Sequence, residues 1–374
     1  MITQDNELHD WLMNLKNLSN HDQIPVDYKE GLKTRLKKFR SDIPLTYTPS
    51  ALEEKRKNIV FYSFMESPHK PQIGEHEYKR LKISWSSLRK HNKDIEVRFC
   101  YSGAGKWVHD TPGAKEKLDK WKQLAEEYDI DMYPFHESFT GEEPNAWCIH
   151  RWYNLALWEN ENLNVLYMDA DTYVHGDIQQ LFDIYSRDPV YGREECGFRH
   201  DPNYGVSGED PRFFLDLVDA SILAQGGKTE VQKYCLGVIL LNHSVHKLFT
   251  PEILSYYTEL LTRIHNFEVF YSIPNYRIMD EFAFWILLSR WSLRTSLFGN
   301  QDVSQTFMEV KHETHFNPLV LHYTTKDEEK FADWAPEFFG LSRNQEEREE
   351  SDLAAGGIYN VNPVMREELA MSMW

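Results

Sequence analysis

The chain has 374 residues, of which 41% are hydrophobic and 14% aromatic, enough for one large or two ordinary domains with sizeable cores. Its 59 acidic and 41 basic side chains give a formal net charge of −18, and this acidic field argues against a nucleic-acid partner. Cys100, Cys148, Cys196 and Cys235 show no CxxC spacing, which argues against a zinc site and a disulfide framework. A cytoplasmic, reducing location is expected.

Residues 1–57 are predicted to form a helical extension. Apolar residues recur there at helical spacing, at Leu8, Trp11, Leu12, Leu15 and Leu18. A second helix, Lys29 to Arg40, is basic, and its charged face is either solvated or in peripheral contact with anionic lipid or an acidic partner. We expect no secretory signal and no transmembrane segment, because no apolar stretch reaches the about 20 residues that a spanning helix needs.

Strand and helix patterns alternate through the next part of the chain. In order, they predict a strand at 59–64, a helix at 78–91, a strand at 95–99, a helix at 115–128, a strand at 130–133 and a helix at 147–158. This alternation is typical of an α/β nucleotide-binding fold with a mostly parallel central sheet. The catalytic domain is therefore predicted to span residues 58–340.

The second half of this domain follows the same pattern with longer interruptions. We predict a buried strand at 165–168, a short helix at 178–184, a buried strand at 238–242 and helices at 253–264 and 280–290. The stretch from Gly192 to Gly208 is read as irregular, either a lid or acceptor loop or a plain surface excursion. Residues 341–374, which contain a run of charges, are predicted to be a polar C-terminal tail.

Two carboxylates follow the apolar run Val165–Met168. Asp169 and Asp171 are two residues apart, so on an extended chain they face the same side, at the carboxyl end of a strand where open α/β sheets place ligands. Two such oxygen donors can share a divalent cation that neutralises a substrate diphosphate. The alternative is an Asx-rich turn that caps the next helix, with Asp177 as a second capping residue.

Taken together, these motifs resemble the GT-A glycosyltransferases of family eight, which include glycogenin and bacterial galactosyl- and glucosyltransferases. The resemblance covers about residues 58–340 and is strongest from Arg151 to Phe182. Three further matches are Gly237–Asn242, Asp280–Glu281 and His322–Tyr323. The resemblance implies a GT-A, Rossmann-like nucleotide-diphospho-sugar transferase fold.

The resemblance also implies a function and a cofactor. The function would be metal-dependent, retaining transfer of a hexose from a UDP-sugar to a glycan, protein or small-molecule acceptor. The metal, Mn²⁺ with Mg²⁺ as the alternative, would be held by Asp169, Asp171 and His322. A lone histidine after a strand can also be a satisfied core or surface residue.

Further residues are assigned to catalysis and to donor binding through the same resemblance. Asp280 and Glu281 are assigned to catalysis, with Glu281 standing where the family has glutamine and able to stabilise or attack the anomeric carbon. The residues assigned to the donor are Phe61, Tyr62, Ser63, Tyr78, Arg151, Asp169, Ala170, Asp171, Cys235, Gly237, Lys326 and Lys330. For Tyr62 and Tyr78 the alternative is core packing, and for Arg151 it is a surface salt bridge.

Three departures from the family pattern keep other functions open. Cys235 replaces an asparagine that contacts the sugar, Thr325 replaces a glycine, and the family's Lys-Pro-Trp is missing, so that Lys326 and Lys330 are its substitutes. These departures favour a nucleotide-sugar-binding pseudoenzyme as an alternative. A sugar nucleotidyltransferase is a second alternative, although the first strand is not followed by a Gly-rich phosphate loop.

Overall fold

The computed structural model describes residues 55–66, 71–104, 113–141, 146–194, 234–258, 279–291, 293–299, 301–305 and 318–323. The predicted N-terminal helices, the tail at 341–374, Lys326 and Lys330 lie outside these ranges. The division into residues 1–57, 58–340 and 341–374 therefore stays a prediction. Among the described helices, none is long and apolar enough to cross a bilayer.

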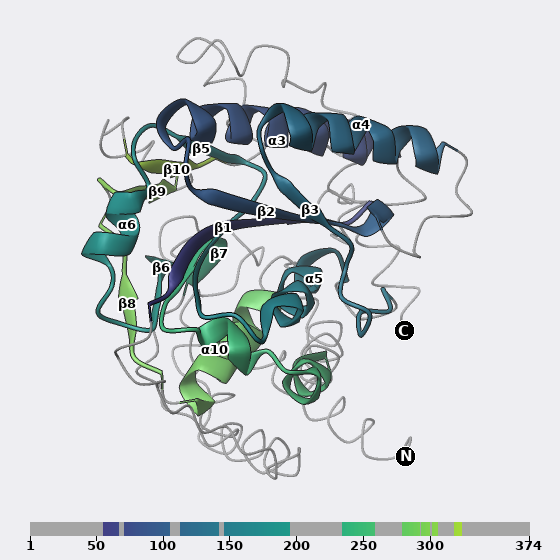
Figure 1. Ribbon diagram of the computed structural model, residues 1–374. Helices are drawn as coiled ribbons and strands as arrows, with labels where there is room; N and C mark the ends of the chain where they lie inside the picture. Colours follow the sequence, from purple (N-terminus) through teal and green to yellow (C-terminus); the bar gives the residue numbers. More distant parts are fainter. Residues whose placement is uncertain are drawn as a thin grey trace, which may run out of the picture.

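A seven-stranded sheet forms the centre of the described fold (Figure 1). Its strands, in spatial order, are β3 (Asp131–Tyr133), β2 (Glu96–Tyr101), β1 (Lys57–Phe64), β4 (Leu163–Met168), β7 (Tyr234–Leu241), β6 (Val190–Glu194) and β8 (Thr295–Leu297). Strands β3, β2, β1 and β4 run parallel, whereas β7 is antiparallel to both of its neighbours and β8 is parallel to β6. The predicted α/β class with a mostly parallel sheet is confirmed.

Helices cover both faces of this sheet (Figure 1). On one face lie α3 (Pro71–His91) and α4 (Ala114–Glu127), and on the other lie α5 (Ala146–Leu155) and α10 (Met279–Arg290). Alternate residues of β1 divide between the two cores, with Val60 and Tyr62 on the α3 side and Ile59 and Phe61 on the α5 side. A strand buried on both faces has no polar side to show, which explains its continuous apolar sequence.

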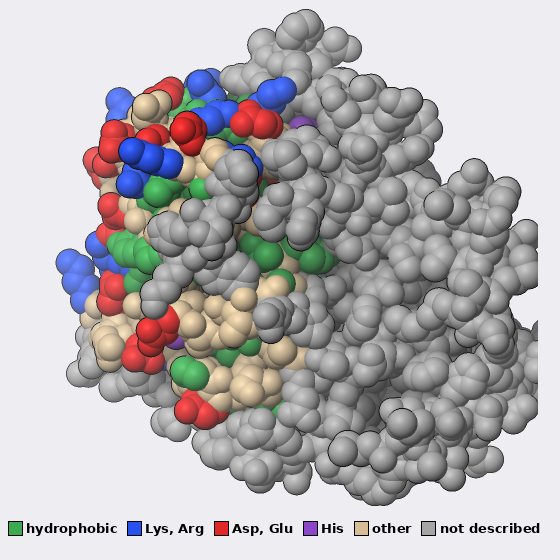
Figure 2. Space-filling view, turned by 90° about the vertical axis from the view of Figure 1, so that its right-hand side faces the viewer, with side chains coloured by type: hydrophobic (Ala, Val, Ile, Leu, Met, Phe, Trp, Pro, Cys, Tyr) green, Lys and Arg blue, Asp and Glu red, His purple; other side chains and the backbone are tan. Residues whose placement is uncertain are grey.

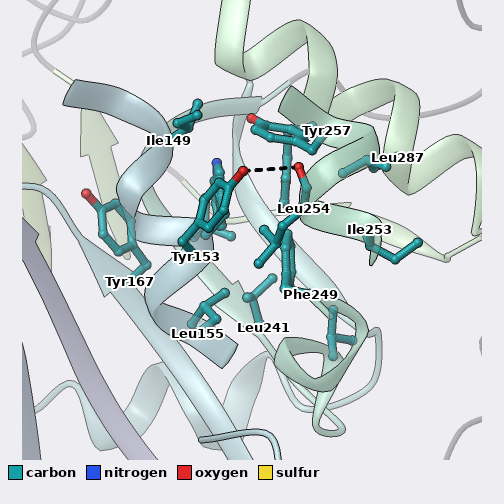
Figure 3. Close-up of a cluster of buried hydrophobic side chains, with 14 of the residues drawn as sticks. Ile149, Tyr153, Leu155, Tyr167, Leu241, Phe249, Ile253, Leu254, Tyr257 and Leu287 are labelled. Carbon is teal, nitrogen blue, oxygen red and sulfur yellow. Dashed lines mark hydrogen bonds between the residues drawn. The ribbon is translucent and has the colours of Figure 1, made fainter. Parts of the chain in front are cut away.

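The core on the α5 side fixes the helix that carries Arg151. Trp152 of α5 stacks on Phe284 of α10 at 4.7 Å between ring centroids and on Phe249 at 5.4 Å. The next residue, Tyr153, packs in the cluster drawn in Figure 3 and donates its hydroxyl to the carbonyl oxygen of Leu254 at 3.3 Å. Stacked aromatic pairs of this kind add to the stability from buried area and set the orientation of the helix.

The outer surface of α3 and α4 is charged with both signs. Lysine, arginine and acidic side chains are interspersed at the height of these helices in Figure 2. An ion pair joins the two helices, between Lys120 Nζ and Glu75 Oε2 at 2.5 Å, and the same ammonium lies 4.2 Å from the ring centroid of Tyr78. Exposed pairs of this kind contribute little to stability, so the surface mainly keeps the helix layer solvated.

A smaller sheet combines segments that are distant in sequence. It contains β5 (Thr172–Val174), β10 (Val320–His322) and β9 (Val303–Gln305), with β10 in the middle, antiparallel to β5 and parallel to β9. His322 pairs with Thr172 in this ladder. The small sheet therefore places the end of β10 beside the segment that follows the two aspartates.

Most predicted elements are present with shifted ends. Helix α6 (Gln179–Ile184) corresponds to the helix predicted at 178–184. The structure also contains the short helices η1 (Ser102–Ala104), η3 (Ala156–Trp158) and η4 (Val245–Leu248). Residues 251–258 are helical, as predicted for 253–264 up to the end of the described range. The prediction of an irregular stretch from Gly192 was wrong for its first residues, since Gly192–Glu194 belong to β6, which pairs with β7 across a bulge at Gly192 and Arg193.

Arg98 is a buried charge that ties the parallel edge of the sheet to the loop before β4. It is 4% exposed, donates two hydrogen bonds to Glu161 at 2.9 and 2.7 Å and one to Glu96 at 2.6 Å, and lies 4.9 Å from the ring centroid of Trp158. We expect Arg98→Met to lower the free energy of unfolding by about 2 kcal/mol, because the carboxylates lose a charged donor but can rehydrate. Urea unfolding measures this change.

The pH dependence of the free energy of unfolding gives a second measurement of the contact between Arg98 and Glu161. The hydrogen bonds from Arg98 lower the pKa of Glu161, so the stability from this pair is present above the carboxyl's ordinary pKa and is lost as the pH falls through the lowered value. Arg98→Met should therefore reduce the loss of stability on acidification. Lys122→Met, at an exposed position of α4, is the control and should change stability by less than about 0.5 kcal/mol. Equal urea-unfolding midpoints for Arg98→Met and Lys122→Met would contradict the prediction.

Candidate active site

Three side chains of types that bind metal ions converge where the two sheets meet. Asp169 follows β4, Asp171 precedes β5, and His322 ends β10. Their ligand atoms all lie within 4.8 Å of one another, and His322 Nε2 is 3.3 Å from Asp171 Oδ1. The side chains are partly accessible, at 30% for Asp169, 20% for Asp171 and 11% for His322. The structure thus brings together the three residues that the sequence suggested as metal ligands.

Backbone hydrogen bonds hold the three residues in place. The amide of Asp169 donates to the carbonyl oxygen of Gly237 at 2.8 Å, and the amide of Tyr323 donates to that of Asp171 at 2.9 Å. The hydroxyl of Thr172 donates to the carbonyl oxygen of Asp169 at 2.8 Å. Because these bonds link the 169–172 turn to β7 and β10, the carboxylates are positioned by both sheets.

Asp171 is kept ionised by its neighbours. Burial raises its pKa, but the nearby imidazole of His322 and the guanidinium of Arg80 lower it by more, so the net shift is downward. Arg80 is 5% exposed and is itself paired with Glu77 at 2.6 Å. An ionised carboxylate that is mostly buried is a ready ligand for a cation.

Asp169 is bound by two donors from the α5 side of the sheet. Arg151 Nη1 lies 3.1 Å from Asp169 Oδ1 and also donates to the carbonyl oxygen of Leu236 at 3.2 Å, while its Nε donates to that of Cys148 at 2.7 Å. The hydroxyl of Tyr167 donates to the same oxygen of Asp169. Burial raises the pKa of Tyr167, so its hydroxyl stays protonated as a donor. Arg151 is thus 7% exposed inside the site, which contradicts a surface salt bridge as its role.

The donor set fits a hard or borderline divalent cation. Two carboxylates and one imidazole suit Mn²⁺, and their oxygens also suit Mg²⁺. Arg151 balances part of the negative charge on Asp169, and the second oxygen of that carboxylate offers a further acceptor. Asp169, Asp171 and His322 would therefore hold the ion, with Arg151 and Tyr167 orienting one of its ligands.

The start of β7 forms another wall of the site. Glu281, the third residue of α10, is 7% exposed, and its Oε1 accepts a hydrogen bond from the amide of Leu236 at 3.3 Å. Gly237 lies against the imidazole of His322, since a Cβ at this position would be 2.2 Å from Cε1. Asp280 precedes Glu281 in α10.

The predicted donor residues of the first strand have mixed positions. Phe61 and Tyr62 are fully buried core residues, and the Tyr62 hydroxyl is hydrogen-bonded to Ser84 at 2.8 Å, so only their backbone can contact a nucleotide. Ser63 is partly exposed and hydrogen-bonds His150 Nδ1 at 2.6 Å. Tyr78 lies on α3 with its ring 5.1 Å from that of Trp121. Core packing therefore accounts for the side chains of Phe61 and Tyr62.

His150, which hydrogen-bonds Ser63 at the end of β1, is uncharged. Burial and the neighbouring charge of Arg151 lower its pKa to about 3, so the imidazole stays uncharged at neutral pH. Its contact with Ser63 is reinforced by Asn154, whose Nδ2 donates to Ser63 Oγ at 3.0 Å. Sequence reasoning missed His150, Tyr167 and Arg80. Arg80 had no signal in the sequence, whereas Tyr167 could have been found, because it lies two residues before Asp169 on the same side of the strand.

Residues 75–200 match the family model described as glycosyl transferase family 8. The match covers about a third of the chain. The matched part runs from α3 through β6 and contains Arg151, Asp169 and Asp171. The match indicates glycosyl transfer, and the mixed α/β sheet has the architecture that the sequence resemblance implied.

Several solved glycosyltransferases are similar to the chain at low sequence identity. Mouse xyloside xylosyltransferase 1 in its apo form is 11% identical, with 71% of this chain and 97% of that chain covered and a TM-score of 0.44. Glycosyltransferase GlyE of Streptococcus pneumoniae TIGR4 is 18% identical, with 72% and 56% covered and a TM-score of 0.42. The galactosyltransferase LgtC in complex with donor and acceptor sugar analogues is 14% identical, with 78% and 99% covered and a TM-score of 0.40. No curated protein matches the chain.

Proposed function

We propose that the protein is a metal-dependent, retaining glycosyltransferase that moves a hexose from a UDP-sugar to a glycan, protein or small-molecule acceptor. The observation that carries the proposal is the convergence of Asp169, Asp171 and His322 within 4.8 Å, at the carboxyl end of β4 in a family 8 region. The three free cysteines among the described residues support a cytoplasmic, reducing location.

Transfer of the sugar requires stabilisation of the negative charge that develops on the leaving diphosphate. The anomeric carbon exchanges a diphosphate oxygen for an acceptor oxygen, and the acceptor's proton leaves with the diphosphate. A divalent cation bound by Asp169, Asp171 and His322 would act as a Lewis acid toward that diphosphate. Arg151 would keep Asp169 oriented through its 3.1 Å contact, and Tyr167 would do so through its hydroxyl.

Two lysines outside the described residues are also proposed to bind the donor. Lys326 and Lys330 follow β10 in the sequence, shortly after His322. Either would add a positive charge to the diphosphate. Asp280, Ala170 and Gly237 are proposed to face the donor because they adjoin Glu281, the aspartate pair and the start of β7.

A panel of UDP-sugars with Mn²⁺ tests the proposed function. We expect slow hydrolysis of one UDP-hexose without any acceptor, and expect it to stop when the ion is removed with a chelator. Titration with Mn²⁺ and UDP accompanies the panel. Binding without hydrolysis of any sugar would identify a nucleotide-sugar-binding pseudoenzyme, and absence of both would overturn the proposal.

Glu281 is proposed to act on the anomeric carbon. Glu281 is 7% exposed, and its Oε1 accepts a hydrogen bond from the amide of Leu236, the residue before Gly237 in β7. We expect Glu281→Gln, which keeps the hydrogen bond but removes the charge, to lower kcat by about 10²-fold, because an oxocarbenium-like state loses a stabilising negative charge.

The comparison with Glu281→Ala separates charge from packing. The alanine variant should lose as much activity as the glutamine variant or more, while both keep the Mn²⁺ affinity of the unaltered protein. Single-turnover hydrolysis of the UDP-sugar measures the chemical step directly. Unchanged turnover in both variants would remove Glu281 from the mechanism.

A further inference from the structure

Cys235 lies next to a proposed metal ligand. Its Sγ is 3.8 Å from His322 Nδ1, and both residues are buried, at 7% and 9% exposed. Cys235 is the second residue of β7, one position before the strand residue whose carbonyl oxygen binds Arg151. The other described cysteines, Cys100 and Cys148, are core residues. Among these three, Cys235 is the one whose thiol lies against a proposed metal ligand.

The imidazole of His322 has little freedom to move. Its Nε2 faces Asp171 at 3.3 Å, and its face lies on Gly237, where a Cβ would be 2.2 Å away. The backbone of His322 is paired with Thr172 in the small sheet. With the ring held in this way, what can change is which of its two nitrogens carries the proton.

A ring nitrogen that binds a cation must offer a lone pair, so the proton of a neutral imidazole then resides on the other nitrogen. In His322, Nε2 faces the carboxylates, and Nδ1 faces Cys235. We propose that Cys235 is a positioning residue that accepts a hydrogen bond from Nδ1–H of His322 and so holds Nε2 ready to bind the ion. This inference rests on the proposed metal-dependent function.

A thiol suits this position because it can also donate. Without the ion, Nε2–H can donate to Asp171 and the thiol can donate to Nδ1. On binding, one proton leaves Nε2 for solvent and one reaches Nδ1 from solvent, so the imidazole is neutral in both states. This exchange moves only protons, so the site can be preorganised for the ion.

Sulfur is a weaker acceptor than the oxygen that usually holds such a histidine. The contact should therefore make His322 a weaker ligand than a carboxylate partner would. We expect Cys235→Ala to weaken Mn²⁺ binding by about tenfold, at the low end of the effects seen when such partners are removed. Cys235→Asp, which places an oxygen acceptor on the same side, should restore or exceed the original affinity.

The experiment uses the full chain and Mn²⁺ alone, with free ion followed by electron paramagnetic resonance. Cys100→Ala is the matched control, because it removes a thiol from a fully buried core position of β2. It should lower stability but leave Mn²⁺ affinity unchanged. Equal affinities for the unaltered protein, Cys235→Ala and Cys235→Asp would overturn the proposal.

Nitrogen-15 spectra of the unaltered protein test the tautomer without any change at Cys235. The His322 signals are those lost in His322→Gln, and diamagnetic Mg²⁺ replaces Mn²⁺. We expect the proton on Nδ1 when the ion is bound, and a proton on Nε2 in that state would overturn the proposal. If the unaltered protein binds neither ion, the metal-dependent function itself falls. Binding with the wrong tautomer, or with no effect of Cys235, rejects only the role of the thiol.

Discussion

Asp171→Asn is expected to abolish measurable Mn²⁺ binding and to lower kcat/KM for the UDP-sugar by about 10³-fold. A cation acting as a Lewis acid contributes several kcal/mol to the transition state, and each 1.36 kcal/mol is a factor of ten in rate. Asp171 is central among the three ligands, since its Oδ1 lies 3.3 Å from His322 Nε2 and its backbone oxygen binds the amide of Tyr323. The amide side chain keeps the size of the carboxylate but loses its charge.

The measurement combines Mn²⁺ titration with hydrolysis kinetics at saturating ion. Asp177→Asn is the control, because Asp177 is exposed and its Oδ1 accepts a hydrogen bond from the amide of Gln179 at 2.9 Å. This is a local Asx-type contact just before α6, of the kind that the sequence offered as the alternative for the aspartate cluster. The control should keep ion binding and activity. Asp171→Asn with normal ion affinity would show that the cluster is a structural turn.

The sequence was sufficient to predict five of the seven strands of the central sheet, all but β6 and β8, and the aspartate pair. Strands such as β1 and β4 have continuous apolar sequences because both faces are covered, and the carboxylates follow β4 directly. The spacing of Asp169 and Asp171 could be interpreted locally, since residues two apart on an extended chain share a side. Local patterns of this kind are sufficient when the partners are near each other in sequence.

The small sheet could not be predicted in the same way. Strands β5, β9 and β10 have three residues each, too few to show alternation, and their pairing depends on contacts between residues far apart in the chain. The proximity of Cys235 to His322 depends on the position of β10 as well, and that of Arg80 to Asp171 depends on the packing of α3 against β5. The family resemblance supplied His322 as a ligand, but it did not indicate which residues orient it.

Gly237→Ala is expected to lower Mn²⁺ affinity by at least about tenfold and the free energy of unfolding by about 1–3 kcal/mol. The sequence suggested that this glycine allows the backbone to approach the donor sugar. The structure shows the imidazole of His322 in contact with it, because a Cβ would be 2.2 Å from Cε1, 2.5 Å from Nε2 and 2.6 Å from Nδ1. Atoms cannot remain at such distances, so the ring or strand β7 has to move.

The consequence of that movement is specific to the metal site. His322 is at the end of β10 and its Nε2 is the only imidazole nitrogen in the described cluster, so a displaced ring removes one of three ligands. The added methyl group would also strain the Cys235 contact, since Nδ1 is among the atoms it approaches. Mn²⁺ titration and urea unfolding on the same sample separate the two effects.

Gly176→Ala is the matched control for this substitution. Its Cβ would be 2.8 Å from Leu319 Cδ2, the end of a flexible side chain just before β10, and this methyl group can rotate away. We therefore expect a small loss of stability and unchanged Mn²⁺ affinity. If Gly237→Ala matched this control in both measurements, the imidazole could not be held against β7, and the preorganised position of His322 would have to be abandoned. A selective loss of ion binding in Gly237→Ala would instead show that position 237 must be glycine to leave space for the imidazole of His322. This conclusion would not depend on any contact between Gly237 and the sugar.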